Sequence, residues 1–292
     1  PYAAQFCLLI IPIGDIIPSE MQNGYRRKTM SLLREKKLFI FDLDGTLYLG
    51  NQVLPGAREL IKGLRAAGKS VCFYTNNSTK SAQAYLERLE RLGFEPSAKE
   101  IISSADVTAD FVLKNRAGKK VFLVGTPSLA EDFEKRGILL SDDADIVISS
   151  FDTSLTYQKA EKACLLIRRG AEYLCTHKDT CCPTDRGFVP DSGAIAAMLT
   201  AATGVEPRFF GKPDPAGMSL ISARTGIPAE DACMFGDRLY TDIAFGNNSG
   251  ALSILVLTGE TSRESAEKCA PAYRPALIYP DLLPVLKDLG LS

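Results

Sequence analysis

Residues 36–46 read KKLFIFDLDGT, an apolar run that ends in two aspartates and a glycine. The run over 36–42 predicts a strand buried in a parallel sheet. Asp42 and Asp44 are two residues apart and would face the same side of an extended chain, and Gly45 allows a sharp turn after them. Because paired carboxylates repel each other unless a cation or a proton is shared, the stretch predicts a cation site at a strand end. An acidic surface turn is the alternative interpretation.

The rest of the chain alternates short apolar runs with amphipathic segments. Strands are expected at 69–75, 100–104, 119–125, 144–150, 172–176, 207–210, 232–237 and 251–257. Helices are expected at 55–67, 79–92, 105–116, 127–136, 155–169, 191–203, 215–225, 239–248, 263–269 and 280–289, with a polar loop at 177–190. This order implies parallel sheets joined by right-handed crossovers. Two such sets, the second starting at 119, agree with 292 residues at roughly 150 per domain.

The composition limits the partners and the chemistry. Lys and Arg number 34 and Asp and Glu 35, a net charge of −1, so we expect neither nucleic acid nor membrane as a partner. His177 is the single histidine, which excludes metal sites built from several histidines. A metal site would therefore consist of carboxylates, which favours Mg²⁺. A carboxylate, a lysine or a tyrosine would carry out acid–base catalysis.

The cysteines and the first residues indicate a cytoplasmic protein with an extension. None of the eight cysteines forms a C-x-x-C pair, and the expected state is free thiols in a reducing cytoplasm. The apolar run at 6–17 is too short to span a bilayer and lacks the basic segment of a signal peptide. Residues 1–29 are therefore expected to lie outside the domain, which would begin at Met30.

Polar residues also follow three further strands. Thr75 and Asn76 follow the second strand, Lys212 follows a short later one, and Asp237 ends the strand at 232–237, with Asp242 five residues on. Ligands bind at the carboxyl ends of strands in open parallel sheets. Thr75 and Asn76 would suit a phosphate or would cap a helix. Lys212 would offset phosphoryl charge or would be an ordinary surface lysine.

The order of these motifs resembles a known enzyme family. DLDGT, TNNS, GKP and GDRLYTD, in this order, are similar to the four motifs of haloacid-dehalogenase (HAD) superfamily phosphatases. The stretches DLDGTLYLG, TNNST, DRGFVP with a following GA, FGKPDP and GDRLYTDI point to the NagD-like, p-nitrophenylphosphatase-like branch (subfamily IIA), and the likeness covers about 36–290. The resemblance implies an α/β fold: a Rossmann-like core with a parallel sheet at 30–117 and 207–292, and an inserted α/β cap of the C2 type at 118–206.

The resemblance also implies which residues act on the substrate. Asp42 would attack phosphorus and form an aspartyl-phosphate, and Asp44 would protonate the leaving oxygen and later activate water. Mg²⁺ would be held by Asp42, by the backbone carbonyl of Asp44 and by Asp237. The implied activity is Mg²⁺-dependent hydrolysis of a small phosphomonoester.

Four further residues would hold the phosphoryl group or support those that do. Thr75, the N–H of Asn76 and Lys212 would bind the transferring phosphoryl group, and Asp242 would orient Lys212 or a metal-bound water. Positioning and charge neutralisation are what phosphoryl transfer needs.

Two cap loops are implied as determinants of specificity. The first contains Asp152, and the second contains His177 and Asp179 and continues to Arg186. Relatives commonly have Thr-Asn-x-Asp in the second loop, and this chain has THKD. His177 is then either an exposed loop residue or, like Arg186, a substrate contact between cap and core.

The sequence departs from the patterns of other members of this superfamily. Dehalogenases lack the second aspartate, P-type ATPases carry threonine there, and about 31 residues between Asp44 and Thr75 are too few for the helical cap of the mutases. The alternative outside catalysis is a phosphometabolite-binding or regulatory protein on the same fold. The substrate stays open among phosphoglycolate, sugar phosphates, pyridoxal phosphate and nucleoside monophosphates. NagD-like relatives often dimerise through the cap, so the resemblance allows a homodimer.

Overall fold

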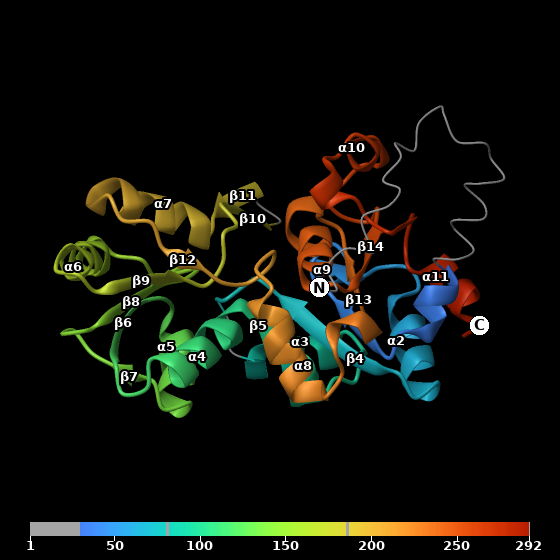
Figure 1. The fold of residues 1–292 in the computed structure, drawn as a ribbon, viewed down its shortest axis with the longest axis horizontal. Helices are drawn as coiled ribbons and strands as arrows, with labels where there is room; N and C mark the ends of the chain where they lie inside the picture. The colour runs from blue at the N-terminus through green and yellow to red at the C-terminus, as the bar shows by residue number, and fades with distance from the viewer. Residues whose placement is uncertain (1–29, 80–81, 185–186, 292) are drawn as a thin grey trace, which may run out of the picture.

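Two parallel sheets form the molecule in the computed structural model, which describes residues 30–79, 82–184 and 187–291 (Figure 1). The predicted extension at 1–29 and the predicted specificity residue Arg186 lie outside the described residues. The first sheet has the strand order β15-β14-β13-β1-β4-β5, and all its pairings are parallel. Its strands are β1 (Leu38–Phe41), β4 (Ser70–Thr75), β5 (Ile101–Ser103), β13 (Ala232–Gly236), β14 (Leu252–Val256) and β15 (Leu277–Tyr279).

Helices cover both faces of the first sheet, as its uninterrupted apolar strands predict. Successive residues of β1 face opposite sides, so Phe39 and Phe41 pack with one group of helices and Leu38 and Ile40 with the other. The first group is α2 (Ala57–Ala66), α3 (Ala82–Arg91) and α11 (Leu283–Leu289). The second group is α4 (Ser104–Asn115), α8 (Ala216–Thr225) and α9 (Ala244–Ser249). Shorter helical elements complete this part. They are residues 30–35, α10 (Arg263–Glu267), a π-helical turn (Leu239–Ile243) and 3₁₀ turns (Ala98–Glu100, Ala229–Asp231, Pro271–Tyr273).

The second sheet has the order β12-β9-β8-β6-β7 and lies beside the first, at the left of Figure 1. Its strands are β6 (Lys120–Val124), β7 (Leu139–Leu140), β8 (Ile146–Ser149), β9 (Glu172–Cys175) and β12 (Arg208–Phe209). Helix α5 (Pro127–Lys135) packs on one face, and α6 (Tyr157–Arg168) and α7 (Ser192–Thr203) pack on the other. Strand β12 pairs with β9, so this sheet extends past the predicted cap boundary at 206.

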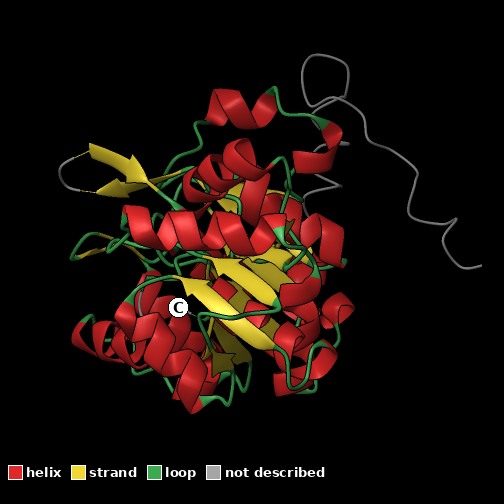
Figure 2. Ribbon diagram, turned by 90° about the vertical axis from the view of Figure 1, so that its left-hand side faces the viewer, coloured by secondary structure: helices red, strands yellow, loops and turns green. Residues whose placement is uncertain are grey.

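The structure corrects the sequence prediction at six places. The predicted polar loop at 177–190 contains a hairpin of β10 (Cys181–Thr184) and β11 (Gly187–Pro190), which projects from the body in Figure 2. Most of its residues are exposed, so no alternation of apolar residues indicated strands. A second hairpin, β2 (Tyr48–Leu49) with β3 (Gln52–Val53), and strands β7 and β15 were also unforeseen. The predicted helix at 239–248 is a π-helical turn followed by α9, and the one at 280–289 begins at Leu283.

Asp106 joins the two parts near the start of α4. It is buried, its carboxylate accepts hydrogen bonds from the N–H and hydroxyl of Ser103, and it forms ion pairs with Arg136 of α5 at 2.5 Å and Arg224 of α8 at 3.6 Å. A buried carboxylate needs such partners to offset its lost hydration. One carboxylate thus ties helices of both sheets together.

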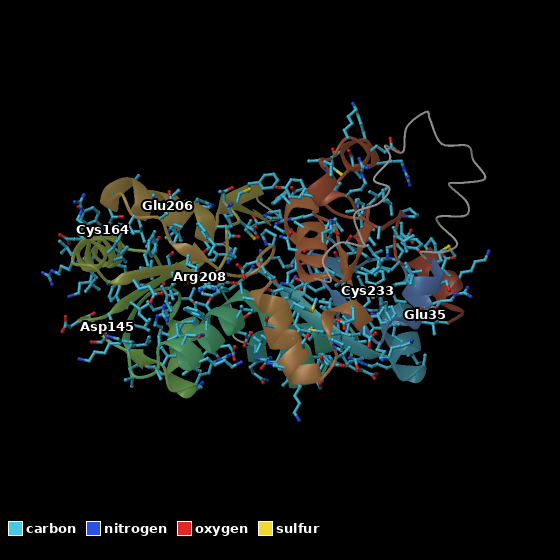
Figure 3. All side chains as sticks on the ribbon, in the orientation of Figure 1. Glu35, Asp145, Cys164, Glu206, Arg208 and Cys233 are labelled. Carbon is cyan, nitrogen blue, oxygen red and sulfur yellow. The ribbon has the colours of Figure 1, made fainter. Side chains whose placement is uncertain are left out.

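Two other features of the described residues bear on the protein's setting. The seven described cysteines are free thiols, and they include Cys233 within the first sheet and Cys164 on helix α6, which packs on the second (Figure 3). None of the described helices combines the length and the apolar character that crossing a membrane requires.

Candidate active site

Three neighbouring strands end at one edge of the first sheet, and residues predicted to form the active site lie at or directly after their ends. Strand β1 lies between β13 and β4, and all three run in the same direction. Asp42 directly follows β1, and its N–H donates to the carbonyl of Phe235 at 2.9 Å. Thr75 ends β4 and Asp237 directly follows β13. The predicted residues therefore converge because parallel strands share one carboxyl edge.

Three carboxylates form a compact group at this edge. Asp42, Asp237 and Asp242 each offer an oxygen, and these atoms all lie within 4.8 Å of one another. Asp237 and Asp242 are buried, and the Asp42 side chain is 13% exposed. The chain approaches closely here: a Cβ at Gly45, whose φ is +92°, would lie 2.6 Å from Oδ2 of Asp237. Only glycine fits that position, since both the space and the backbone angle exclude a side chain.

The crowding of acidic groups changes their ionisation. Burial, opposed by Lys212 and reinforced by Asp242 and Asp237, raises the pKa of Asp42 well above its usual range. Burial and the Asp242 carboxylate raise the pKa of Asp237 to about 7. Ionised carboxylates at this distance require positive charge between or beside them.

Lys212 supplies one such charge. Its Nζ lies 2.5 Å from Oδ1 of Asp42 and 2.7 Å from Oδ1 of Asp242, and it donates to the carbonyl of Tyr74 at 3.0 Å. The side chain is only 2% exposed. Burial would lower the pKa of Lys212, but the Asp242 and Asp42 carboxylates outweigh it and raise that pKa, so the ammonium stays charged. The interpretation of Lys212 as a solvated surface lysine is wrong.

The remaining acidic charge fits a hard divalent cation. Oδ2 of Asp237 accepts a hydrogen bond from the N–H of Glu260 at 2.7 Å, but its buried Oδ1 has no hydrogen-bond partner among the described residues. Such an atom is costly unless something absent from the protein chain satisfies it. The donors here are oxygens, which Mg²⁺ prefers.

Asp44 lies apart from this group. Its side chain is 45% exposed, and its Oδ1 is 3.8 Å from Nη2 of Arg88. The expectation that its side chain shares a cation with Asp42 through strand alternation is wrong. Strand β1 ends at Phe41, and the chain turns at Gly45 to form the β2–β3 hairpin. The metal contact that the resemblance implied uses the backbone carbonyl of Asp44 and stays a prediction.

Thr75 and Asn76 are buried beside the carboxylates. They do not cap a helix, since the described part of α3 begins only at Ala82. The hydroxyl of Thr75 accepts from the N–H of Asn77 at 3.1 Å. The Asn76 side chain accepts from the N–H of Lys212 at 2.8 Å and donates to its carbonyl at 2.9 Å. Asn76 thus positions Lys212, a role that the sequence did not indicate.

The cap residues of the second loop differ from expectation. His177 is buried, so its interpretation as an exposed loop residue is wrong. Its Nε2 lies 2.8 Å from Oδ1 of Asp191, and its Nδ1 lies 3.3 Å from the hydroxyl of Ser104 on α4. Asp179 reaches the active site, where it accepts from Nδ2 of Asn76 at 3.1 Å. The histidine therefore supports the loop, and the aspartate faces the core motifs.

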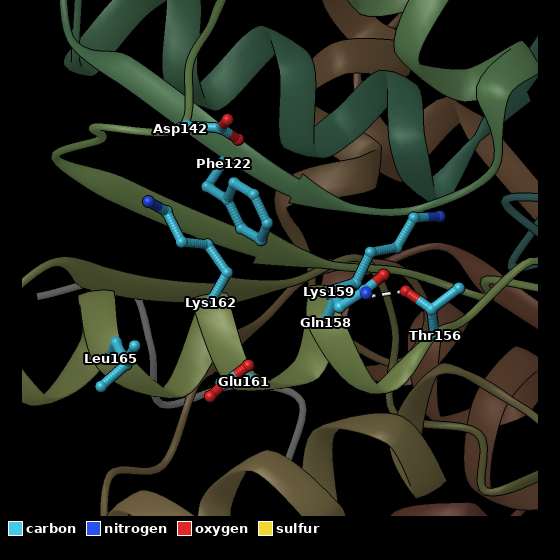
Figure 4. Close-up of a pocket in the computed structure, with 8 residues that line it drawn as sticks. All are labelled: Phe122, Asp142, Thr156, Gln158, Lys159, Glu161, Lys162 and Leu165. Atoms are coloured by element: carbon cyan, nitrogen blue, oxygen red, sulfur yellow. Dashed lines mark hydrogen bonds between the residues drawn. The ribbon is translucent and has the colours of Figure 1, made fainter.

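Asp152, in the first cap loop, lies outside the carboxylate group. Its buried carboxylate accepts from the N–H and hydroxyl of Ser154 at 2.8 and 2.6 Å and pairs with Lys159 at 2.8 Å. Lys159 also lines the hollow in Figure 4, beside Phe122 and α6. None of the predicted catalytic, metal-binding or phosphate-binding residues lines that hollow. Asp152 stabilises its own loop, and we do not assign it a role in specificity.

Two family models match most of this molecule. One, described as haloacid dehalogenase-like hydrolase, matches residues 39–139, and another, described as HAD-hydrolase-like, matches residues 209–285. An acid sugar phosphatase of Staphylococcus saprophyticus is 35% identical over 259 residues, which are 88% of this chain and 99% of that protein.

Solved structures show the same relationship. The crystal structure of 4-nitrophenylphosphatase from Thermotoga maritima has a TM-score of 0.85 and 40% identity, over 88% of this chain and 99% of that one. A glycerol phosphate phosphatase of Mycobacterium tuberculosis, crystallised with magnesium, has a TM-score of 0.80 and 34% identity, over 88% and 77% of the two chains. In both comparisons the similarity covers 88% of this chain.

Proposed function

Since this chain belongs to the haloacid dehalogenase-like hydrolases and is a phosphatase of their NagD-like branch, we propose that it hydrolyses small phosphomonoesters with Mg²⁺ through an aspartyl-phosphate intermediate. The observation that carries this proposal is the buried group of Asp42, Asp237 and Asp242 with Lys212 bound between two of its carboxylates. This group places a nucleophile, a cation site and a fixed positive charge together, as phosphoryl transfer requires.

Asp42 is the proposed nucleophile. Its carboxylate oxygen forms a bond to phosphorus while the bond from phosphorus to the leaving oxygen breaks. Burial favours the protonated form of Asp42, and the ammonium of Lys212 at 2.5 Å favours the ionised, nucleophilic form. Lys212 also offsets charge on the phosphoryl oxygens, which the hydroxyl of Thr75 and the N–H of Asn76 would bind.

Asp44 is the proposed acid and base. Its half-exposed carboxyl lies outside the buried group, where it can give a proton to the departing oxygen and receive one from the water that cleaves the intermediate. The nearby guanidinium of Arg88 lies 3.8 Å from it. This separation of roles resembles other sites in which two carboxyl groups act in different environments.

Asp42, Asp237 and the backbone carbonyl of Asp44 would hold Mg²⁺. Bound there, the ion would supply charge neutralisation for the phosphoryl oxygens. The orphaned Oδ1 of Asp237 supports this assignment, and so does the Mg²⁺ in the M. tuberculosis relative.

Release of phosphate from p-nitrophenyl phosphate tests the mechanism. Asp42→Asn and removal of Mg²⁺ by a chelator should each abolish turnover, whereas the exposed Asp143→Asn should leave it unchanged. Trapped aspartyl-phosphate in the wild type, absent from Asp42→Asn, would identify the nucleophile. Equal activity of wild type and Asp42→Asn would refute the mechanism. Binding of phosphate esters without turnover in the wild type would instead indicate a binding protein.

The substrate is proposed as a small phosphorylated metabolite, since relatives are named for sugar, nitrophenyl and glycerol phosphates. The second sheet, about residues 118–209, is the proposed cap over the site, and the Asp179 loop is its proposed specificity element. Comparing kcat/KM over a panel of phosphate esters would rank the candidates. A cytoplasmic location and a homodimer stay predictions, which cell fractionation and light scattering would check.

A further inference from the structure

Arg238 follows Asp237 directly, yet the mechanism above leaves its side chain without a role. Its N–H donates to Oδ2 of Asp242 at 3.1 Å, and its carbonyl accepts from the N–H groups of Asp242 and Ile243 at 3.1 Å each. The main chain of Arg238 is thus fixed beside the carboxylate group. The guanidinium extends away from this point and is only 17% exposed.

On the core side, the guanidinium binds the loop that orients Asp237. Its Nε lies 3.0 Å from Oε2 of Glu260, and the N–H of the same glutamate donates to Asp237 at 2.7 Å. The hydroxyl of Tyr240 donates to the other carboxylate oxygen of Glu260 at 2.8 Å. One end of Arg238 is therefore held by an ion pair with Glu260, which is itself hydrogen-bonded to Asp237 and Tyr240.

On the cap side, the guanidinium faces Asp179. Nη1 of Arg238 lies 3.8 Å from Oδ2 of Asp179, the same oxygen that accepts from Asn76 at 3.1 Å. Asn76 in turn holds the main chain of Lys212. The carboxylate of the cap loop thus lies between two core residues, one neutral and one positively charged.

This arrangement gives the guanidinium a specific task. A partly buried arginine is stable only if carboxylates offset its lost hydration, and Asp179 and Glu260 do so here. Because 3.8 Å exceeds hydrogen-bond length, Arg238 attracts Asp179 through charge, which lysine would retain and glutamine would remove. The attraction draws the loop towards the core, where the same carboxylate also accepts a hydrogen bond from Asn76.

We propose that Arg238 is a positioning residue that holds the Asp179 loop of the second sheet over the active site and so sets how well the leaving group fits. The inference rests on the proposed phosphatase function. Arg238 would affect how tightly the leaving group binds. Asp42, Asp44 and Lys212 would carry out the reaction at phosphorus. A group that acts only through the loop should change KM more than kcat.

Steady-state kinetics of four variants test this proposal with Mg²⁺ present. They are Arg238→Gln, Asp179→Asn, the double variant and Arg238→Lys, assayed on p-nitrophenyl phosphate, glycerol 3-phosphate and glucose 6-phosphate. We expect each neutral single variant to raise KM about fivefold, by an amount that differs among the three esters, while kcat changes less than about twofold. The double variant should be no worse than either single variant, because one interaction is lost only once. Arg238→Lys should recover most of the affinity.

Several results would overturn the inference. Two of them are additive effects of the two single changes and an unchanged KM in Arg238→Gln. The third is an equal loss of kcat on all three esters, which would indicate that Arg238 acts by orienting Asp237. Arg263→Gln removes an exposed arginine and should match the wild type. Urea unfolding checks the fold, and if Arg238→Gln does not fold, an unchanged KM in both Arg238→Lys and Asp179→Asn refutes the proposal. A wild type inactive on every ester would overturn the proposed function, whereas an active wild type with any result above overturns this inference alone.

Discussion

Without its metal, this protein should lose stability as the pH rises towards neutrality, because of Asp237. Burial and the Asp242 carboxylate raise the pKa of Asp237 to about 7 from an ordinary value of 3.8. Between these values the folded protein holds a proton that the unfolded chain has released. The folded state binds more protons, so the free energy of unfolding falls with rising pH across this window.

The magnitude follows from the two pKa values. A difference of one bound proton changes the free energy of unfolding by about 1.4 kcal/mol per pH unit, so the span from 3.8 to about 7 amounts to about 4 kcal/mol. The buried side chain of Asp237 has little solvent to screen this effect. The pKa of Asp42 is raised as well, and its titration acts in the same direction.

Urea unfolding in a chelator at pH 4, 5, 6, 7 and 8 measures this effect. Asp237→Asn, which stays neutral at every pH, is the matched comparison. We expect the wild type to lose about 4 kcal/mol relative to this variant between pH 4 and pH 8, with most of the loss visible above pH 5. The proposed Mg²⁺ would bind the ionised carboxylate, so adding Mg²⁺ should restore stability most at pH 8 and only in the wild type. Parallel pH profiles for the two proteins, or a wild type that gains stability with pH, would refute the reasoning.

Three further substitutions test other parts of the structure. Lys212→Gln leaves two buried carboxylates without their ammonium, so it should lower the free energy of unfolding by about 3–5 kcal/mol and kcat by about 10²-fold or more; a kcat near that of the wild type would contradict this role. Asp44→Asn cannot protonate the leaving oxygen and should lower kcat about 10²–10⁴-fold on alkyl phosphates, and less on p-nitrophenyl phosphate, whose phenolate departs readily; equal losses on both would argue against an acid. Asp106→Ala removes the carboxylate that pairs with the N-cap Ser103 in the capping box of α4 and the ion pair with Arg136, and should lower the free energy of unfolding by about 3 kcal/mol. The exposed ion pair of Asp110 in the same helix is the control, and Asp110→Ala should cost about 0.5 kcal/mol or less, with similar losses for both variants arguing against the role of Asp106.

Most strands of both sheets, though not β7 or β15, could be predicted because their sequences carry the physical signal that defines them. Segments 36–42 and 144–150 have uninterrupted apolar centres, LFIF and IVI, as burial on both faces requires, and both form strands. The hairpin of Cys181–Thr184 and Gly187–Pro190 could not be predicted in this way. It is mostly exposed and includes Pro183, and its backbone pairing leaves no pattern of apolar residues in the sequence.

The site was predictable in its members and only partly in its contacts. Parallel strands bring Asp42, Thr75 and Asp237 to one edge, so their convergence followed from the order of elements. The exposure of Asp44 did not follow, because the turn at Gly45 ends the alternation of the strand. Burial of His177 was equally hidden, since its partner Asp191 lies 14 residues further along the chain.

The sequence by itself determined the fold class, the order of the strands' polar ends and the identity of the carboxylates and lysine of the site. These depend on local periodicity and on short motifs, both of which can be recognised from the order of residues alone. Only the tertiary structure decided which charges meet: Lys212 between Asp42 and Asp242, Asn76 against Asp179, and Arg238 between Glu260 and the loop of the second sheet. Coulombic and hydrogen-bond energies depend on distance and burial, and residues up to 170 positions apart acquire both only when the chain folds.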